Sequence, residues 1–167
     1  MEHITLITTG GTIDKVYGRG KGIRDLHIGR GVAFGLFLKM ELDSVLTFHP
    51  KSVTTKDSLD LNDDERKAIA DACVSANTSK IIITHGTDTM VQTAQVLSEA
   101  SIPPRRTIVL TGAALPACVK DTDAELNLGL ALGVCLFAPP GIYIVLNGVH
   151  HWNQCAKDAK TGIFEPV

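Results

Sequence analysis

The sequence predicts an α/β fold with a mostly parallel sheet, because short β-branched runs alternate with longer helix-forming segments along the chain. The run 81–84 contains only Ile and Thr, and such runs are typical of strands buried on both faces. Polar turns with glycine follow several of these runs. Together these features indicate a Rossmann-like, doubly wound sheet flanked by helices on both faces. At 167 residues, a single domain covering 1–167 is expected.

The individual elements follow from periodicity and from turn residues. Pro50 is expected to end the second strand, since proline is disfavoured inside sheets. Asn62 or Asp63 is expected to cap a helix that carries acidic residues in its first turn. Residues 54–61 are interpreted as a polar connection and 147–167 as a polar tail. The predicted strands are 4–8, 44–49, 81–84, 107–110 and 142–146, and the predicted helices are 32–42, 62–77, 89–99 and 121–136.

Composition excludes several classes of function. The formal net charge of −2 argues against a nucleic-acid partner, which favours a basic face. No apolar run is long enough to cross a bilayer, so no membrane partner is expected. The first residues lack the pattern of a secretory signal, and a cytoplasmic location is expected. The four cysteines and six histidines are dispersed, so the cysteines are interpreted as reduced thiols, and neither a metal nor a cofactor is expected.

Polar side chains follow the strand 81–84 directly. Gly86 breaks the run, and Thr87 and Asp88 come next, before a helix-forming segment. The carboxyl edge of strands in an open α/β sheet is where ligands bind, beside helix N-termini. The alternative is that Thr87 or Asp88 merely caps the helix, but capping accounts for only one of the two residues. The sequence therefore favours a functional site here.

A second turn of this kind follows the strand 4–8, where Gly10 and Gly11 precede Thr12. Backbone N–H groups on such a turn can face a developing oxyanion. A threonine hydroxyl becomes a nucleophile only when a base takes its proton, and a lysine oriented by Asp88 could be that base. His85 is expected only to stabilise its turn. With Ala113 after the strand 107–110, these turns should meet at one edge.

The segment 15–31 is rich in glycine and contains few apolar anchors. It follows the turn that carries Thr12, and we interpret it as a mobile active-site loop that could act as a lid. An inert surface loop is the alternative.

Two of these turns resemble the signatures of bacterial-type L-asparaginases. They are TTGGTI at 8–13 and HGTDTM at 85–90, and the LTGA of 110–113 and the dipeptide Asn127-Leu128 resemble further blocks of that family. The resemblance extends from about residue 4 to about residue 165. It implies a Rossmann-like fold and an amidohydrolase that converts L-asparagine to L-aspartate and ammonia through a threonine acyl-enzyme.

The resemblance also implies catalytic roles for particular residues. Thr12 corresponds to the primary nucleophile. Thr87 and Asp88 correspond to the second threonine and the aspartate, which act with a lysine. Lys157 fits that lysine best and Lys160 is the alternative, while Tyr17 resembles a lid tyrosine that helps to activate the nucleophile.

Substrate contacts are implied in the same way. Ser58 corresponds to the hydroxyl that holds the α-carboxylate, Asp88 would also meet the α-amino group, and the Ala113 carbonyl would face the leaving amide. The implied substrate-binding residues are Gly11, Ser58, Leu59, Gly86, Thr87, Asp88 and Ala113.

Two departures from the family pattern bear on substrate selection. Full-length members have a second, C-terminal domain, and this sequence ends before it, so the chain resembles a short-chain member. Leu59 stands where many members have Gln or Ser. Self-association into a homo-oligomer is expected, since a neighbour could then supply the missing group. The alternative function is a non-catalytic amino-acid binding domain of the same fold. A dinucleotide-binding domain is excluded because the glycine fingerprint is absent.

Overall fold

A six-stranded sheet forms the centre of the structure, a computed structural model that describes residues 1–18, 26–42 and 44–167. The strand order is β4-β1-β5-β6-β7-β8, and each neighbouring pair is parallel except β7 and β8. The predicted mostly parallel sheet is therefore confirmed. Its strands are β1 (Glu2–Gly10), β4 (Leu46–Lys56), β5 (Lys80–Thr84), β6 (Thr107–Thr111), β7 (Gly141–Val145) and β8 (Val149–His151).

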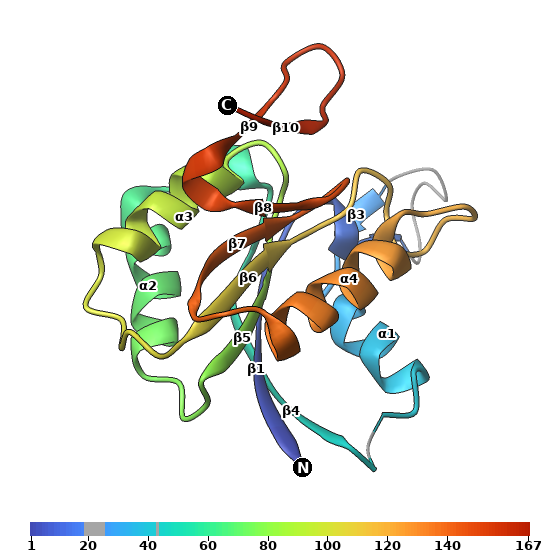
Figure 1. Cartoon of the computed structure of the whole chain (residues 1–167). Coiled ribbons are helices and arrows are strands. Elements are labelled where there is room, and N and C mark those ends of the chain that lie inside the picture. The colour runs from blue at the N-terminus through green and yellow to red at the C-terminus, as the bar shows by residue number, and fades with distance from the viewer. Residues whose placement is uncertain (19–25, 43) are drawn as a thin grey trace.

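Helices cover both faces of this sheet (Figure 1), as predicted. Helices α1 (Val32–Lys39) and α4 (Ala124–Phe137) lie on one face, and α2 (Asp63–Val74) and α3 (Met90–Glu99) lie on the other. Each of the four is shorter than the predicted segment. No helix in the described part of the chain is long and apolar enough to span a membrane.

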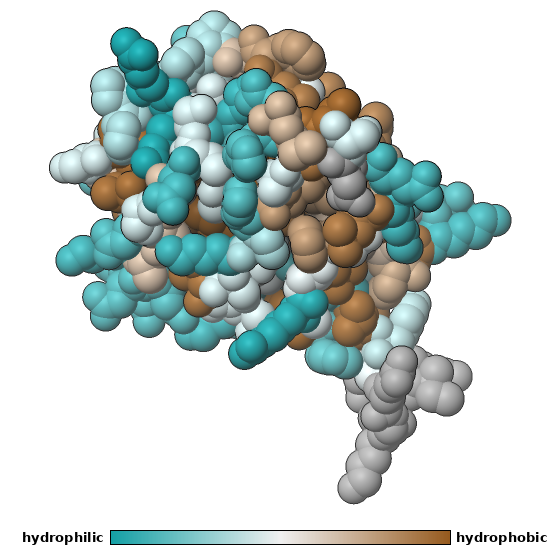
Figure 2. Space-filling view, turned by 90° about the horizontal axis from the view of Figure 1, so that it is seen from below, coloured by the Kyte–Doolittle hydropathy of each residue, from teal (hydrophilic) through white to brown (hydrophobic). Residues whose placement is uncertain are grey.

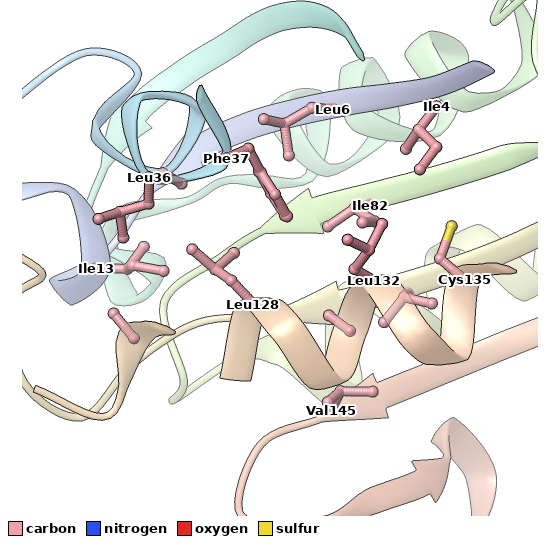
Figure 3. Close-up of a cluster of buried hydrophobic side chains, with 14 of the residues drawn as sticks. Ile4, Leu6, Ile13, Leu36, Phe37, Ile82, Leu128, Leu132, Cys135 and Val145 are labelled. Atoms are coloured by element: carbon pink, nitrogen blue, oxygen red, sulfur yellow. The ribbon is translucent and has the colours of Figure 1, made fainter. Parts of the chain in front are cut away.

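The continuous isoleucine run in β5 reflects burial on both faces. Ile82 belongs to the core cluster beneath α1 and α4, drawn in Figure 3. Ile81 and Ile83 belong to the cluster beneath α2 and α3. Because successive strand side chains point to opposite faces, a strand buried between two helical layers has no position left for a polar residue.

The start of α2 follows local sequence rules. The Asn62 side chain accepts from the Glu65 N–H at 2.9 Å, and the Glu65 carboxylate accepts from the Asn62 N–H at 3.1 Å. This reciprocal capping box satisfies two backbone donors that the helix leaves free. The predicted cap at Asn62 is confirmed.

The prediction that Pro50 ends the second strand is wrong. Strand β4 continues through Pro50, which pairs with Leu6, and runs to Lys56. Strand β4 lies at the edge of the sheet and pairs only with β1 among the described residues. Proline lacks only a donor, and an edge strand tolerates that loss where the missing N–H would face away from its partner.

Three segments interpreted as irregular contain regular structure. In the predicted mobile loop, β2 (Lys15–Tyr17) pairs antiparallel with β3 (Leu26–Ile28), while residues 19–25 lie outside the described part of the chain. The polar connection 54–61 completes β4 and forms a 3-10 turn, η2 (Ser58–Asp60). The tail adds β8, a short turn η3 (Trp152–Gln154), and the hairpin of β9 (Cys155–Lys157) and β10 (Phe164–Pro166).

Asp14 links the first turn to the start of α1. This residue ends the short turn η1 (Thr12–Asp14) and is 1% exposed. Its carboxylate accepts from the Ala33 N–H at 3.2 Å, and its carbonyl accepts from the Gly29 N–H at 2.7 Å. Burial is the main cause that raises the pKa of Asp14 from 3.8 to about 6, and the helix N–H groups oppose it only in part.

We therefore expect Asp14→Asn to change how stability depends on pH. The folded state binds the Asp14 proton more tightly than the unfolded state, because its folded pKa is raised to about 6. The stability that the wild-type fold gains from binding this proton is fully present below about pH 4 and is lost as the pH rises through 6. The free energy of unfolding of the variant, relative to wild type, should rise by about 2–3 kcal/mol over this range.

Urea unfolding at pH 4, 5, 6 and 7 measures the difference. Asp71→Asn, at an exposed position on α2, is the matched control and should show little pH-dependent change. If the free energies of unfolding of Asp14→Asn and wild type differ by the same amount at every pH, the raised pKa of Asp14 is contradicted.

Candidate active site

Two glycine turns and a 3-10 turn meet backbone to backbone at the carboxyl edge of the sheet. Gly11, at φ +83°, lies so close to the turn after β5 that a Cβ on it would stand 2.5 Å from the Gly86 nitrogen. A Cβ on Gly86 would stand 2.6 Å from Ser58 Oγ. These contacts join the ends of β1 and β5. After β1 the chain continues through α1 to β4, and after β5 it continues through α3 to β6, on the other side of the pair. Ligands bind at such a switch point in doubly wound sheets.

The turn after β6 is held against the same edge. A Cβ on Gly112 would collide with the His85 carbonyl oxygen. The Asp123 carboxylate accepts from the N–H groups of Ala114 and Leu115, both at 2.9 Å. Asn127, in the first turns of α4, donates to the Gly112 carbonyl at 3.1 Å and to Asp123 at 2.9 Å. Helix α4 therefore fixes the buried backbone around Ala113.

Lys157 reaches this edge from the far end of the chain. Its Nζ donates to Thr87 Oγ1 at 2.8 Å and to Asp88 Oδ1 at 2.6 Å. The Lys157 side chain is mostly buried, and that of Asp88 is about half-exposed. Lys160 is exposed, and its backbone N–H donates to the Asp158 carboxylate. The structure thus brings Lys157 to the Thr87–Asp88 pair.

The side chains of Thr87 and Asp88 do not cap α3. The N-cap residue of α3 is Thr89, which makes no side-chain capping bond. The Thr89 hydroxyl instead donates to the Ser58 carbonyl at 2.8 Å and ties η2 to the turn after β5. Thr87 and Asp88 bond Lys157. The capping alternative considered for Thr87 and Asp88 is therefore wrong.

His85 is part of a buried network beneath the turn. Its Nδ1 lies 2.7 Å from the Gly86 carbonyl and must donate, so Nε2 accepts from Thr93 Oγ1 at 2.8 Å. Thr93 in turn accepts from Arg66 at 3.1 Å. Burial is the main cause that lowers the pKa of His85 to about 4. The imidazole is therefore neutral at pH 7, and His85 stabilises the turn, as expected.

The remaining predicted residues differ in exposure. Thr12 is partly buried at the start of η1, directly after Gly11, and Tyr17 lies in β2 with half of its surface exposed. Ser58 Oγ is buried and has no hydrogen-bond partner in the described part of the chain. A buried hydroxyl without a partner beside a glycine turn is suited to a ligand. Leu59, next to it, is 70% exposed.

Four supporting residues were not predicted from the sequence. They are Arg66, Thr89, Thr93 and Asp123. Asp123 lies in the first turn of the predicted helix 121–136, where acidic residues are enriched, so it could have been found. Arg66 and Thr93 meet only because α2 packs against α3, and Thr89 meets the Ser58 carbonyl only because η2 lies beside the turn after β5.

The edge holds donors and acceptors suited to a small polar ligand. Among residues 1–18, 26–42 and 44–167, no group of three or more His, Cys, Asp or Glu side chains could hold a metal ion. A cavity of about 550 Å³ between β1, β4 and the end of α2 is lined by His3, His49 and Thr78. That cavity lies near the opposite ends of the strands and shares no lining residue with the turns described above.

Comparisons with known proteins agree with this arrangement. The family model "Asparaginase, N-terminal" matches residues 3–163. A probable periplasmic L-asparaginase of Haemophilus influenzae is 31% identical over 135 residues, which are 77% of this chain and 37% of that protein. One of the subunits of the glutamyl-tRNA(Gln) amidotransferase of Methanosarcina mazei is 26% identical over 162 residues, which are 93% of this chain and 36% of that protein.

The solved structure of the thermostable L-asparaginase from Thermococcus kodakarensis matches with a TM-score of 0.85 at 25% identity. The match covers 99% of this chain and 51% of that one. The chain thus spans little more than a third of the two curated relatives and about half of the solved structure. Since the family model covers nearly all of its residues, the chain belongs to the asparaginase family and corresponds to its N-terminal part.

Proposed function

We propose that this chain hydrolyses the side-chain amide of L-asparagine and releases L-aspartate and ammonia. The observation that carries the proposal is the contact of Lys157 Nζ with both Thr87 Oγ1 and Asp88 Oδ1. A hydroxyl, an amine and a carboxylate in direct contact form a relay that can accept and return a proton. Simple binding of an amino acid does not require a lysine that is already paired within the site.

The proposed reaction has two halves. Thr12 Oγ attacks the amide carbon, its proton passes to a neutral Lys157 amine through the Thr87 hydroxyl, and backbone N–H groups stabilise the oxyanion. The carbon–nitrogen bond then breaks, and ammonia leaves with a returned proton. A water molecule hydrolyses the threonine ester, releasing aspartate and regenerating the Thr12 hydroxyl. Tyr17, from β2, is proposed to help activate Thr12.

The proposed substrate contacts use groups at the same edge. Ser58, whose buried hydroxyl has no partner in the described residues, would hold the α-carboxylate. Asp88 would meet the α-ammonium group, and the Ala113 carbonyl would face the leaving amide. Gly11 and Gly86 allow the backbone to approach the substrate closely, and Leu59 forms the rim.

The state of assembly and the cellular location are proposed as well. We propose a homo-oligomer, since a neighbouring copy could supply a polar group at the rim beside Leu59. The four cysteines are free thiols, which is usual in a reducing compartment, and we therefore propose the cytoplasm, although the Haemophilus relative is described as periplasmic.

A second candidate follows from the similarity to the Methanosarcina amidotransferase chain. In that case the same edge would release ammonia for another protein chain to use. Ammonia release from asparagine by the purified chain alone distinguishes the first function from this one and from a non-catalytic binding domain.

Thr12→Val should remove nearly all amidase activity, because it deletes the attacking oxygen and little else. We expect a loss of about 10³-fold or more in kcat, with binding of aspartate retained. Ammonia release and calorimetric binding of aspartate measure the two quantities. Thr47→Val, which deletes a hydroxyl that donates to the Met1 sulfur at the opposite end of the strands, is the control. Near-wild-type turnover in Thr12→Val would exclude Thr12 as the nucleophile.

Lys157→Met and Asp88→Asn should act as one unit. Each is expected to lower kcat by about 10²–10⁴-fold, and the double variant should be little worse than either, because each single change already breaks the relay. Steady-state kinetics of the four combinations measure the coupling. Lys160→Met is the control and should keep its activity. If the losses in kcat of the two single variants multiply in the double variant, or if Lys160→Met is inactive, the proposed relay is contradicted.

Leu59→Gln should strengthen substrate binding. The leucine side chain is 70% exposed, so the change should cost little stability and add a hydrogen-bonding group at the rim. One added charge-assisted hydrogen bond would lower KM for asparagine by about tenfold with kcat nearly constant. Leu38→Gln, at a 49% exposed position on α1, is the control. An unchanged KM would remove Leu59 from the substrate-binding set.

A further inference from the structure

Two histidines from distant parts of the chain meet at the amino end of the sheet. His3 lies on β1 and His49 lies on β4, 46 residues later, and both are exposed. In the parallel register His3 pairs with Thr47 and His49 pairs with Thr5, so the two imidazoles are diagonal neighbours on one face of the sheet. His3 Nδ1 lies 3.1 Å from His49 Nε2, and the ring centroids are 5.3 Å apart. The pairing of β1 with β4 therefore brings two ring nitrogens together.

The spacing of these two nitrogens suits a shared metal ion. Zinc binds histidine nitrogen at about 2.0–2.1 Å, so two nitrogens 3.1 Å apart would form an angle of about 100° at an ion between them. This angle lies between the right angle of square-planar and octahedral sites and the wider angle of a tetrahedron. In the metal-free pair one ring donates a proton to the other. When a metal takes the place of that proton, the proton moves to the second nitrogen of its own ring, so both facing nitrogens offer a lone pair. In Figure 2, which shows another side of the molecule in part, hydrophilic residues are interspersed with apolar ones.

We propose that His3 and His49 together bind one divalent transition-metal ion of the class of Zn²⁺, Ni²⁺ and Cu²⁺, with water in its remaining positions. Imidazole nitrogen suits these ions, whereas Mg²⁺ and Ca²⁺ favour oxygen ligands. Because 46 residues separate the two histidines, the pair could not be recognised in the sequence. The proposal therefore departs from the expectation that no metal is bound, which was drawn from the dispersal of the histidines.

The proposed site is open, because only two protein side chains hold the ion. A structural zinc site is closed by four protein ligands, and a catalytic zinc site has three. No larger cluster of His, Cys, Asp or Glu side chains that could hold a metal occurs in residues 1–18, 26–42 and 44–167, so water must complete the coordination. An ion held in this way exchanges with the solvent and is not a permanent part of the fold.

The cavity beside the two histidines has room for these water ligands. Both histidines line it, and its volume is about 550 Å³. No Asp or Glu from the described part of the chain lines the cavity, and Lys51 on its wall donates to Ser75 Oγ at 3.4 Å. Because no carboxylate neutralises the ion and a lysine lies on the same wall, electrostatic repulsion opposes binding. We therefore expect a dissociation constant in the micromolar range.

A metal ion at this place would link the edge strand β4 to its neighbour through side chains. Strand β4 pairs only with β1 among the described residues. The cavity shares no lining residue with the turns that carry Thr12, Thr87 and Asp88, so this inference does not depend on the proposed reaction.

Calorimetric titration with Zn²⁺ at about pH 7.5, where imidazole is ordinarily neutral and can bind a metal, tests the proposal. All chains carry Cys118→Ser, which removes an exposed thiol that could also bind zinc. The chain with this change alone should bind one Zn²⁺ and no Mg²⁺. His3→Gln and His49→Gln should each weaken zinc binding by at least about tenfold, the smallest loss that even an outer partner of a metal ligand typically causes. His27→Gln, at an exposed position on β3, is the matched control and should bind zinc unchanged.

Nuclear magnetic resonance of the imidazole nitrogens tests the proposed ligand atoms directly. As Zn²⁺ is added, the ¹⁵N resonances of His3 Nδ1 and His49 Nε2 should shift together, and those of His27 should stay in place. The two substituted chains, His3→Gln and His49→Gln, assign these resonances and show by their amide spectra that the fold is retained. A shift of only one of the two imidazoles would overturn the shared ion.

Two further outcomes would overturn the proposal. One is zinc binding that His3→Gln and His49→Gln weaken no more than His27→Gln does. The other is a chain that does not bind Zn²⁺, including one that binds inorganic phosphate instead, in which case the basic wall of the cavity would be an anion site.

Discussion

The close approach of the turns at the carboxyl edge of the sheet is the constraint on which the rest of the site depends. Gly11 leaves no room for a side chain beside Gly86, nor does Gly86 beside Ser58. Gly112 is equally close to His85. Because these four segments approach one another so closely, a side chain at any of the three glycines would force them apart. The geometry at this edge therefore follows from the absence of Cβ atoms.

Buried polar residues keep these turns in place at a cost that packing must offset. His85 is held neutral between Gly86 and Thr93, and Asp123 accepts two backbone N–H groups beyond Gly112. A buried polar group stabilises a fold only when its hydrogen bonds are complete. These networks are complete, whereas the Ser58 hydroxyl is left without a partner among the described residues. The Thr84 hydroxyl, at the end of β5, is likewise buried without a partner among the described residues, so both hydroxyls differ from the groups that support the site.

Much of the architecture could be predicted from local patterns. The isoleucine run of β5, the capping signal at Asn62 and the turns after β1, β5 and β6 each depend on neighbouring residues only. Features that depend on the assembled sheet could not be predicted. Whether Pro50 interrupts a strand depends on β4 lying at an edge, and strand order is a property of the whole chain. The exposure of Leu126, Leu130 and Phe137 on α4 likewise could not be predicted, since an apolar helix of that length is equally consistent with complete burial.

The choice between Lys157 and Lys160 also depends on structure that the sequence does not reveal locally. Lys157 and Lys160 are three residues apart in the same short segment, and from the sequence either side chain could have reached Thr87 and Asp88. The difference arises because β9 pairs with β10, which buries Phe164 and aligns Lys157 opposite it. The Asp158 carboxylate then closes the turn by accepting from the N–H groups of Lys160 and Thr161. A hairpin of six paired residues thereby brings Lys157 to Thr87 and Asp88, about seventy residues earlier in the chain. The proposed relay is consequently only as stable as this terminal hairpin, which makes the packing of Phe164 a requirement for the site as well as for the fold.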